Sequence, residues 1–131
     1  ILVGDPDPVQ VDMHRACEEA LLACEAAIAP GSTMGDVFTA HADVLDAAGY
    51  RKHRLNACGY GMGAVYAPVW TDWPMIYEGN PLAFEADQTY FLHMILLDLD
   101  DQRAMTLGHT VVVTDGGCER LSRSNLDLVM A

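Results

Sequence analysis

The spacing of apolar residues changes once along this chain, and that change constrains its fold most. Apolar side chains recur three and four residues apart over residues 13–28 and again over 37–48. The helical period disappears after Gly49. Between residues 89 and 114, two runs rich in β-branched and aromatic residues flank a polar turn. The pattern predicts two consecutive helices followed by an antiparallel β-hairpin.

Capping residues set the bounds of the two helices. Asp7 supplies an N-cap acceptor and Pro8 the first helical position. Thr33 and Asp36 have the spacing of a capping box. Glycines follow each apolar stripe, as is typical of helix ends. We predict helices over about residues 8–29 and 34–48.

The rest of the chain predicts a sheet. We expect strands over about residues 51–58, 62–67, 88–98 and 103–114, and an irregular loop over 67–80. The fold class is then α+β, with two N-terminal helices packed on an antiparallel curved sheet. A chain of 131 residues can bury roughly two-thirds of its unfolded surface, so one domain over residues 1–131 can be stable without a structural metal.

Charge and composition exclude several functions. The net charge of −12 repels phosphate backbones, so we expect no nucleic-acid partner. The longest apolar stretch, residues 90–97, is too short to cross a bilayer, so we expect no membrane partner. Four dispersed cysteines without a C-x-x-C pair predict reduced thiols and a cytoplasmic location.

Two histidines of the hairpin are candidates for catalysis. If the hairpin is centred near Asp101, His93 lies directly opposite His109. Residues directly opposite each other have Cβ atoms about 5 Å apart. The two imidazole rings would then be close enough to share a proton. A register slip of one residue would send one ring to the other face, which leaves two unrelated histidines as the alternative.

A glycine-rich segment, Gly-Tyr-Gly-Met-Gly at residues 59–63, suggests a close backbone approach. No Lys-Ser/Thr pair follows it, so a phosphate-binding loop is not indicated. Either the segment aims Tyr60 into a pocket, or it is a bulged strand with Tyr60 packed in the core.

Several motifs in order resemble a known family. They are Gly-Asp-Pro at 4–6, Ala-Pro-Gly at 29–31, Ala-Ala-Gly-Tyr at 47–50, the segment at 59–63, and Thr-Val-Val-Val-Thr-Asp-Gly-Gly-Cys-Glu-Arg-Leu at 110–121. From about Val3 to Leu121 the chain resembles the second half of the pita-bread catalytic domain of creatinase, prolidase, aminopeptidase P and methionine aminopeptidase. The Gly-Tyr variant and the Gly-Cys-Glu-Arg-Leu ending are closest to the creatinase-like and ectoine-hydrolase-like branch.

The resemblance bears on metal binding. Active peptidases of the family hold two divalent metal ions with two Asp, one His and two Glu. The Asp pair would precede Ile1, so we expect this chain to be a fragment that lacks an N-terminal half. The family His falls on Tyr60, one Glu on or beside His93, and the last Glu on Gly108 or His109. We therefore predict no metal ligands and no cofactor, since a phenol and imidazoles do not replace bridging carboxylates.

The resemblance implies a hydrolase that acts on a C–N bond of a small amide, amidine or Xaa-Pro-type substrate. We expect His93 and His109 to act as general acid or base and Tyr60 to donate to the developing oxyanion. Substrate-binding roles are expected for Tyr66, Trp70 and His53. The alternative is a catalytically inactive domain that binds peptides or proteins through a rim of aromatic side chains around the pocket, formed by Tyr66, Trp70, Trp73 and Tyr77.

Half of a pita-bread domain would leave strand edges exposed. We therefore expect a homodimer. The resemblance further implies a small molecule or a short peptide as substrate. We also expect the isolated chain to be inactive without the missing half.

Overall fold

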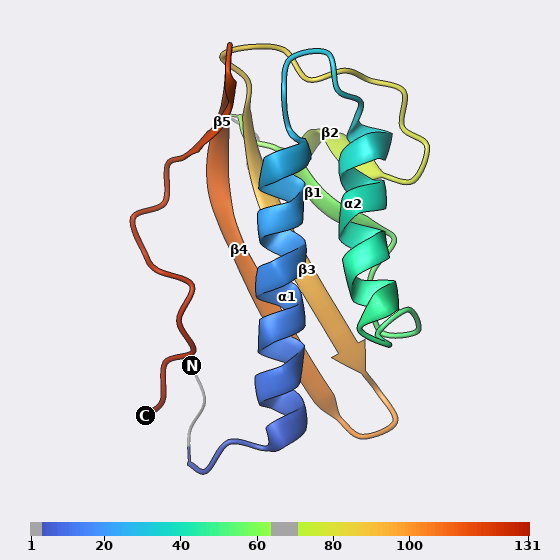
Figure 1. The fold of residues 1–131 in the computed structure, drawn as a ribbon, viewed down its shortest axis with the longest axis vertical. Coiled ribbons are helices and arrows are strands. Elements are labelled where there is room, and N and C mark those ends of the chain that lie inside the picture. Colours follow the sequence, from blue (N-terminus) through green and yellow to red (C-terminus); the bar gives the residue numbers. More distant parts are fainter. Residues whose placement is uncertain (1–3, 64–70) are drawn as a thin grey trace.

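Two helices lie side by side on one face of a five-stranded antiparallel sheet (Figure 1). The computed structural model describes residues 4–63 and 71–131. The strand order is β2-β1-β3-β4-β5. The predicted α+β class is confirmed. The elements in chain order are α1 (Pro8–Ala27), α2 (Met34–Ala47), β1 (Ala57–Gly61), β2 (Asp72–Tyr77), β3 (Thr89–Asp98), β4 (Arg103–Thr114) and β5 (Gly117–Arg120).

Both helices begin at the capping residues that the sequence indicates. The Asp7 side chain accepts a hydrogen bond from the Val9 amide at 2.9 Å. Thr33 and Asp36 form the complete capping box, in which each side chain accepts from the other's amide. These bonds satisfy amides that the first helical turn leaves unpaired. Neither α1 nor α2 is long and apolar enough to cross a membrane.

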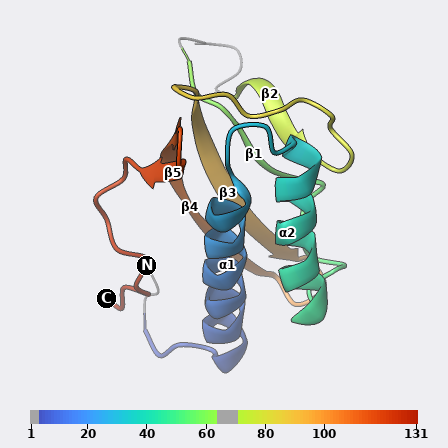
Figure 2. The same cartoon turned by 45° about the horizontal axis from the view of Figure 1, so that its top comes forward.

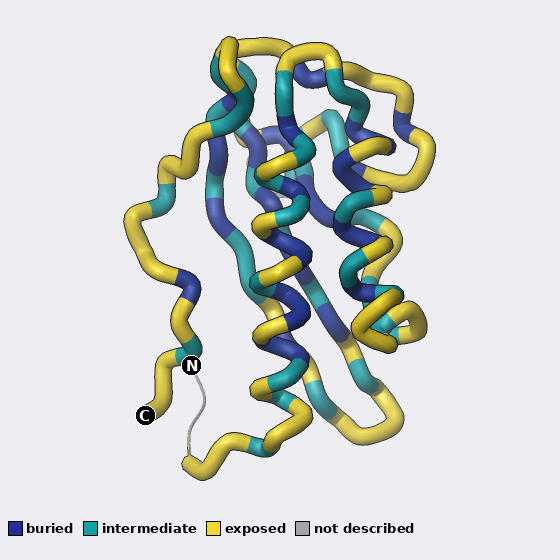
Figure 3. The backbone as a smooth tube through the Cα atoms, viewed as in Figure 1, coloured by how far each residue is buried: buried dark blue, intermediate teal, exposed yellow. Residues whose placement is uncertain are grey.

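The core lies between the helices and one face of the sheet, where dark blue marks buried residues in Figure 3. Along β3 every second side chain points to this face, as strand geometry requires. In Figure 2, α1 runs along β3 and β4, and α2 packs over β1 and β2. The buried side chains of β3 and β4 are Tyr90, Leu92, Met94, Leu96, Met105, His109, Val111 and Val113.

The strand predictions for the middle of the chain need correction. Only Ala57 and Cys58 of the predicted strand 51–58 lie in a strand, because a turn follows α2. In the predicted strand 62–67, residues 62 and 63 are not in a strand, and 64–67 lie outside the described residues. The predicted loop 67–80 contains β2. Its bulged, Pro-containing pairing with β1 breaks the alternation that identifies a strand in sequence.

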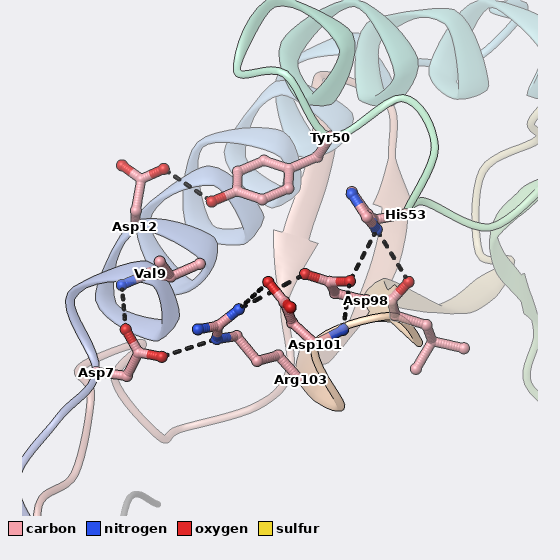
Figure 4. Close-up of polar contacts among 9 residues, drawn as sticks. Asp7, Val9, Asp12, Tyr50, His53, Asp98, Asp101 and Arg103 are labelled. Atoms are coloured by element: carbon pink, nitrogen blue, oxygen red, sulfur yellow. Dashed lines mark hydrogen bonds and ion pairs between the residues drawn. The ribbon is translucent and has the colours of Figure 1, made fainter.

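Polar contacts fasten the hairpin tip to the start of α1 (Figure 4). Arg103 pairs with Asp7 at 2.7 Å and with Asp101 at 2.6 Å. The Tyr50 hydroxyl, just after α2, donates to Asp12 of α1 at 2.8 Å. Together these contacts hold the ends of both helices against the sheet.

His41 of α2 makes the folded state sensitive to acid. Its side chain is 1% exposed. Burial, helped by the positive charge of Arg54 and opposed by Asp46, lowers its pKa to about 4 from the ordinary value of 6.5. The unfolded chain therefore binds a proton first as the pH falls, so stability that is present above pH 6.5 is lost toward pH 4.

We expect the unfolding free energy to fall by up to about 3 kcal/mol through His41 between pH 7 and pH 4. Urea unfolding of the wild type and of His41→Gln at several pH values measures this. The variant should lose less stability on acidification. If the unfolding free energy fell equally steeply with pH in both proteins, His41 would not be the cause of the acid sensitivity.

Candidate functional site

Tyr60 lies on the sheet face that the helices leave uncovered, called here the open face. Ala57 pairs with Tyr77 and Gly59 pairs with Ile76, so Cys58 is the extra residue of a β-bulge. The bulge buries Cys58 in the core and places Tyr60 opposite Phe91 of β3. Tyr60 is therefore not a core residue.

The glycines beside Tyr60 allow neighbouring backbones to come close. A Cβ on Gly59 would lie 2.7 Å from the Phe91 carbonyl oxygen, and a Cβ on Gly61 would lie 2.7 Å from that of Trp73. Only glycine fits such approaches without moving a strand. The segment is thus a bulged glycine-rich strand that also aims Tyr60 outward.

Three rings form an aromatic cluster on the open face. The His93 ring lies 5.2 Å from the Phe91 ring and 6.3 Å from the Tyr60 ring, edge-on to both. His93 Nε2 forms a hydrogen bond of 2.9 Å with Thr106 Oγ1. Partial burial lowers the pKa of His93 below its ordinary value, so the ring is neutral near pH 7 and can accept a proton.

A pocket of about 190 Å³ opens beside this cluster. It lies where β1, β2 and β3 adjoin on the open face. Among the described residues of its lining, only Tyr60 and His93 carry titratable side chains. The lining residues are Leu55, Ala57, Gly59, Tyr60, Thr71, Met75, His93 and Ile95.

The prediction that His93 lies opposite His109 is wrong. His93 pairs with Gly108, and His109 pairs with Leu92. The loop between Asp98 and Arg103 has an even number of residues, with Gln102 at a φ of 53°, so the register differs by one from a hairpin centred on Asp101. A shift of one residue reverses the face, and His109 points to the helices.

His109 belongs to a polar cluster beneath α1. Its Nε2 contacts the Glu25 carboxylate, which Arg120 also binds with two hydrogen bonds of 3.0 Å. His109 is 1% exposed, and burial lowers its pKa despite the nearby Glu25 charge. In this position it cannot reach a substrate on the open face and instead joins β4 to α1.

The predicted substrate-binding residues do not gather at the pocket. His53 Nδ1 donates to the Leu97 carbonyl at 3.2 Å, and Asp98 lies 3.9 Å away (Figure 4). His53 is therefore part of the contact with the hairpin and does not line the pocket. Tyr66 and Trp70 lie outside the described residues.

The residues at the positions where the resemblance predicts metal ligands do not fit a pair of divalent cations. Among the residues described, no three His, Cys, Asp or Glu side chains are placed to hold a metal ion. Gly108 has no side chain, and the Phe91 ring occupies the space beside it, 2.8 Å from where a Cβ would lie. Tyr60 and His93 alone supply no carboxylate to neutralise bound cations.

The packing around Gly108 can be tested by adding one methyl group. A Cβ there would lie 2.5 Å from the Leu92 carbonyl oxygen, which is backbone and cannot rotate away. We expect Gly108→Ala to lower the unfolding free energy by about 1–3 kcal/mol in urea titrations. Gly116→Ala, with open space around it, is the control and should change stability by less than about 0.5 kcal/mol. If both substitutions changed the unfolding free energy equally, the space beside Gly108 would not be filled by its neighbours.

Sequence reasoning missed Phe91, Ile95 and Thr106. The first two share the face of His93 because they are two residues away along β3, a signal that was present in the sequence. Thr106 could not be found, because its place beside His93 depends on the hairpin register.

Known proteins resemble this chain over most of its length. Metallopeptidase family M24 matches residues 1–115. No curated protein matches. Among solved structures, the dipeptidase PepE from Mycobacterium ulcerans is 26% identical with a TM-score of 0.87, over 98% of this chain and 33% of its own. The X-Pro aminopeptidase from Thermotoga maritima is 17% identical with a TM-score of 0.90, over 100% and 36%.

A methionine aminopeptidase from Rickettsia prowazekii is 19% identical with a TM-score of 0.71, over 89% of this chain and 54% of its own. The 131-residue chain thus spans about a third of the length of the dipeptidase and of the X-Pro aminopeptidase. It spans about half of the length of the methionine aminopeptidase.

Proposed function

This chain belongs to metallopeptidase family M24, and we propose that it is one half of the catalytic domain of a hydrolase that breaks C–N bonds. Its fold is the pita-bread fold of the solved structures that it matches. The substrates we propose are small amides, amidines or Xaa-Pro compounds, in keeping with relatives named as dipeptidases, prolidases and X-Pro aminopeptidases. We further propose that it works in the cytoplasm.

The observation that carries this proposal is the placement of His93 and Tyr60 beside one pocket on the open face. Thr106 holds the His93 ring through Nε2. A neutral imidazole near pH 7 suits general base catalysis, and a phenol can donate a hydrogen bond to an oxyanion. His109 takes no part in this proposal, because it lies on the other face of the sheet.

The proposed reaction uses these two side chains in order. His93 accepts a proton from water as the water oxygen bonds to the substrate carbon, and Tyr60 donates to the resulting oxyanion. Protonated His93 then gives that proton to the leaving nitrogen as the C–N bond breaks. No step involves a metal ion, because the donor set at the family's metal positions does not fit one.

One observation favours a second function, the binding of a peptide or protein. Trp73 on edge strand β2 is 67% exposed. Large aromatic side chains are enriched at binding surfaces, and an edge strand can pair with an added peptide strand. In that case the domain would bind such a ligand without turnover.

Two substitutions test the catalytic proposal in the longest polypeptide that the gene encodes. We expect His93→Gln to lower kcat on a panel of amides and Xaa-Pro dipeptides by at least about 100-fold, and Tyr60→Phe by a similar factor. Tyr77→Phe makes the same chemical change at a tyrosine of β2 that does not line the pocket, and should leave kcat unchanged.

Circular dichroism should show that all three variants are folded. An unchanged kcat in His93→Gln would exclude this histidine from the reaction. Absence of turnover in the wild type, together with binding of peptides, would favour the binding function.

We also propose that the isolated chain forms a homodimer through the edge of β4. Among the described strands, β5 pairs only with residues 111–114 of β4, so residues 104–109 have a strand on one side only. Such an edge presents unpaired amides and carbonyls that can pair with another strand.

Light scattering should therefore give twice the monomer mass of 14.2 kDa. Thr106→Lys, which places a charge on this edge, should lower the dimer fraction by about tenfold. Thr39→Lys on the exposed surface of α2 is the matched control and should leave the dimer intact. A wild-type monomer at all concentrations would refute the dimer.

A further inference from the structure

The pocket on the open face has a chemistry that narrows the ligand. Its lining combines aliphatic side chains, Leu55, Met75 and Ile95, with Tyr60, His93 and Thr71. The pocket therefore has an apolar lining with a few hydrogen-bonding groups.

The acidic character of the chain does not extend into this pocket. The net charge is −12, yet Asp101 at the hairpin tip is paired with Arg103, which also binds Asp7 before α1. On β3 and β4 the positions that face the open side of the sheet carry no carboxylate between Thr89 and Leu97 or between Ala104 and Val112. Since no Asp, Glu, Lys or Arg is among the described residues that line the pocket, a charged group inside it would lose its hydration without gaining a counter-charge in that lining, which is unfavourable.

The size of the pocket also limits the ligand. In other proteins, an apolar cavity of about 150 Å³ holds one benzene molecule. This pocket, at about 190 Å³, can hold one ring or a branched aliphatic group of similar size.

Polar groups at one side of the pocket favour a ligand with both a donor and an acceptor. Tyr60 offers a hydroxyl and His93 a ring nitrogen, because its other nitrogen, Nε2, is bound to Thr106. A carboxamide supplies a carbonyl acceptor and an N–H donor without a charge. An amidinium ion offers only donors, and a carboxylate only acceptors.

We propose that this pocket binds the uncharged apolar part of a neutral carboxamide, about one ring in size, in preference to amidines and carboxylates. The reaction that would follow rests on the proposed hydrolase function, but the binding preference does not. Within the three substrate classes above, the pocket thereby selects amides over amidines.

Three probes with the same ring and different charges test the proposal: benzamide, benzamidine and benzoate. Each is titrated into the 131-residue chain and followed through the backbone amide resonances of Tyr60, His93 and Ile95. We expect benzamide to shift these resonances and to bind at least tenfold more tightly than the other two. Tighter binding of benzamidine or benzoate, or binding of none, would overturn the proposal.

A substitution in the pocket should reverse the preference. Ile95→Asp places a carboxylate in the lining, so benzamidine should then bind at least tenfold more tightly than benzamide. Leu97→Asp places the same group two residues along β3, outside the lining, and should keep the wild-type order. If Ile95→Asp does not fold, Thr71→Asp at the end of the pocket replaces it. An unchanged order in the folded pocket variant would contradict the assignment of this pocket.

Failure of the binding proposal and failure of the hydrolase proposal give different results. Benzamide binding by the 131-residue chain, with no turnover of any amide by the longest polypeptide that the gene encodes, supports this inference and refutes the hydrolase. Turnover of amides with preferred binding of benzamidine supports the hydrolase and refutes this inference.

Discussion

The pairing of β3 with β4 determines which chemistry is possible on each face of this sheet. His93 lies opposite Gly108, and His109 lies opposite Leu92. Side chains alternate between faces along a strand, so this one register separates the two histidines completely. His93 is left with Tyr60 and Thr106 on the open face, while His109 is buried against Glu25 of α1.

The two faces of the sheet consequently have different roles. The covered face holds the apolar core and one polar cluster, in which the Glu25 carboxylate receives Arg120 and His109. The cluster links α1 to β4 and β5 and has no access to the pocket. On β3 and β4 the open face carries no carboxylate, in a chain with a large negative net charge, which is typical of a surface that another chain segment or a ligand covers.

The positions at which the resemblance to the family predicts metal ligands show how a shared fold can carry a different site. At Gly108 the side chain is absent, and the Phe91 ring fills the adjoining space. At residue 60 a phenol stands where the resemblance to the family predicts an imidazole. Such a surface suits hydrogen bonding and apolar contact, whereas bridging a pair of cations requires carboxylates. Membership in a metallopeptidase family therefore fixes the fold of this chain more firmly than its chemistry.

The sequence by itself determined the two helices, their capping residues, the hairpin and the family, because these depend on local periodicity and on motifs in order along the chain. The sequence also indicated, through its glycines, that neighbouring backbones approach closely around Tyr60. Only the tertiary structure decided the hairpin register, the bulge at Cys58 and the edge strand β2. Each of these depends on how backbones pair across a sheet, and a difference of one residue in that pairing moves a side chain from one face to the other.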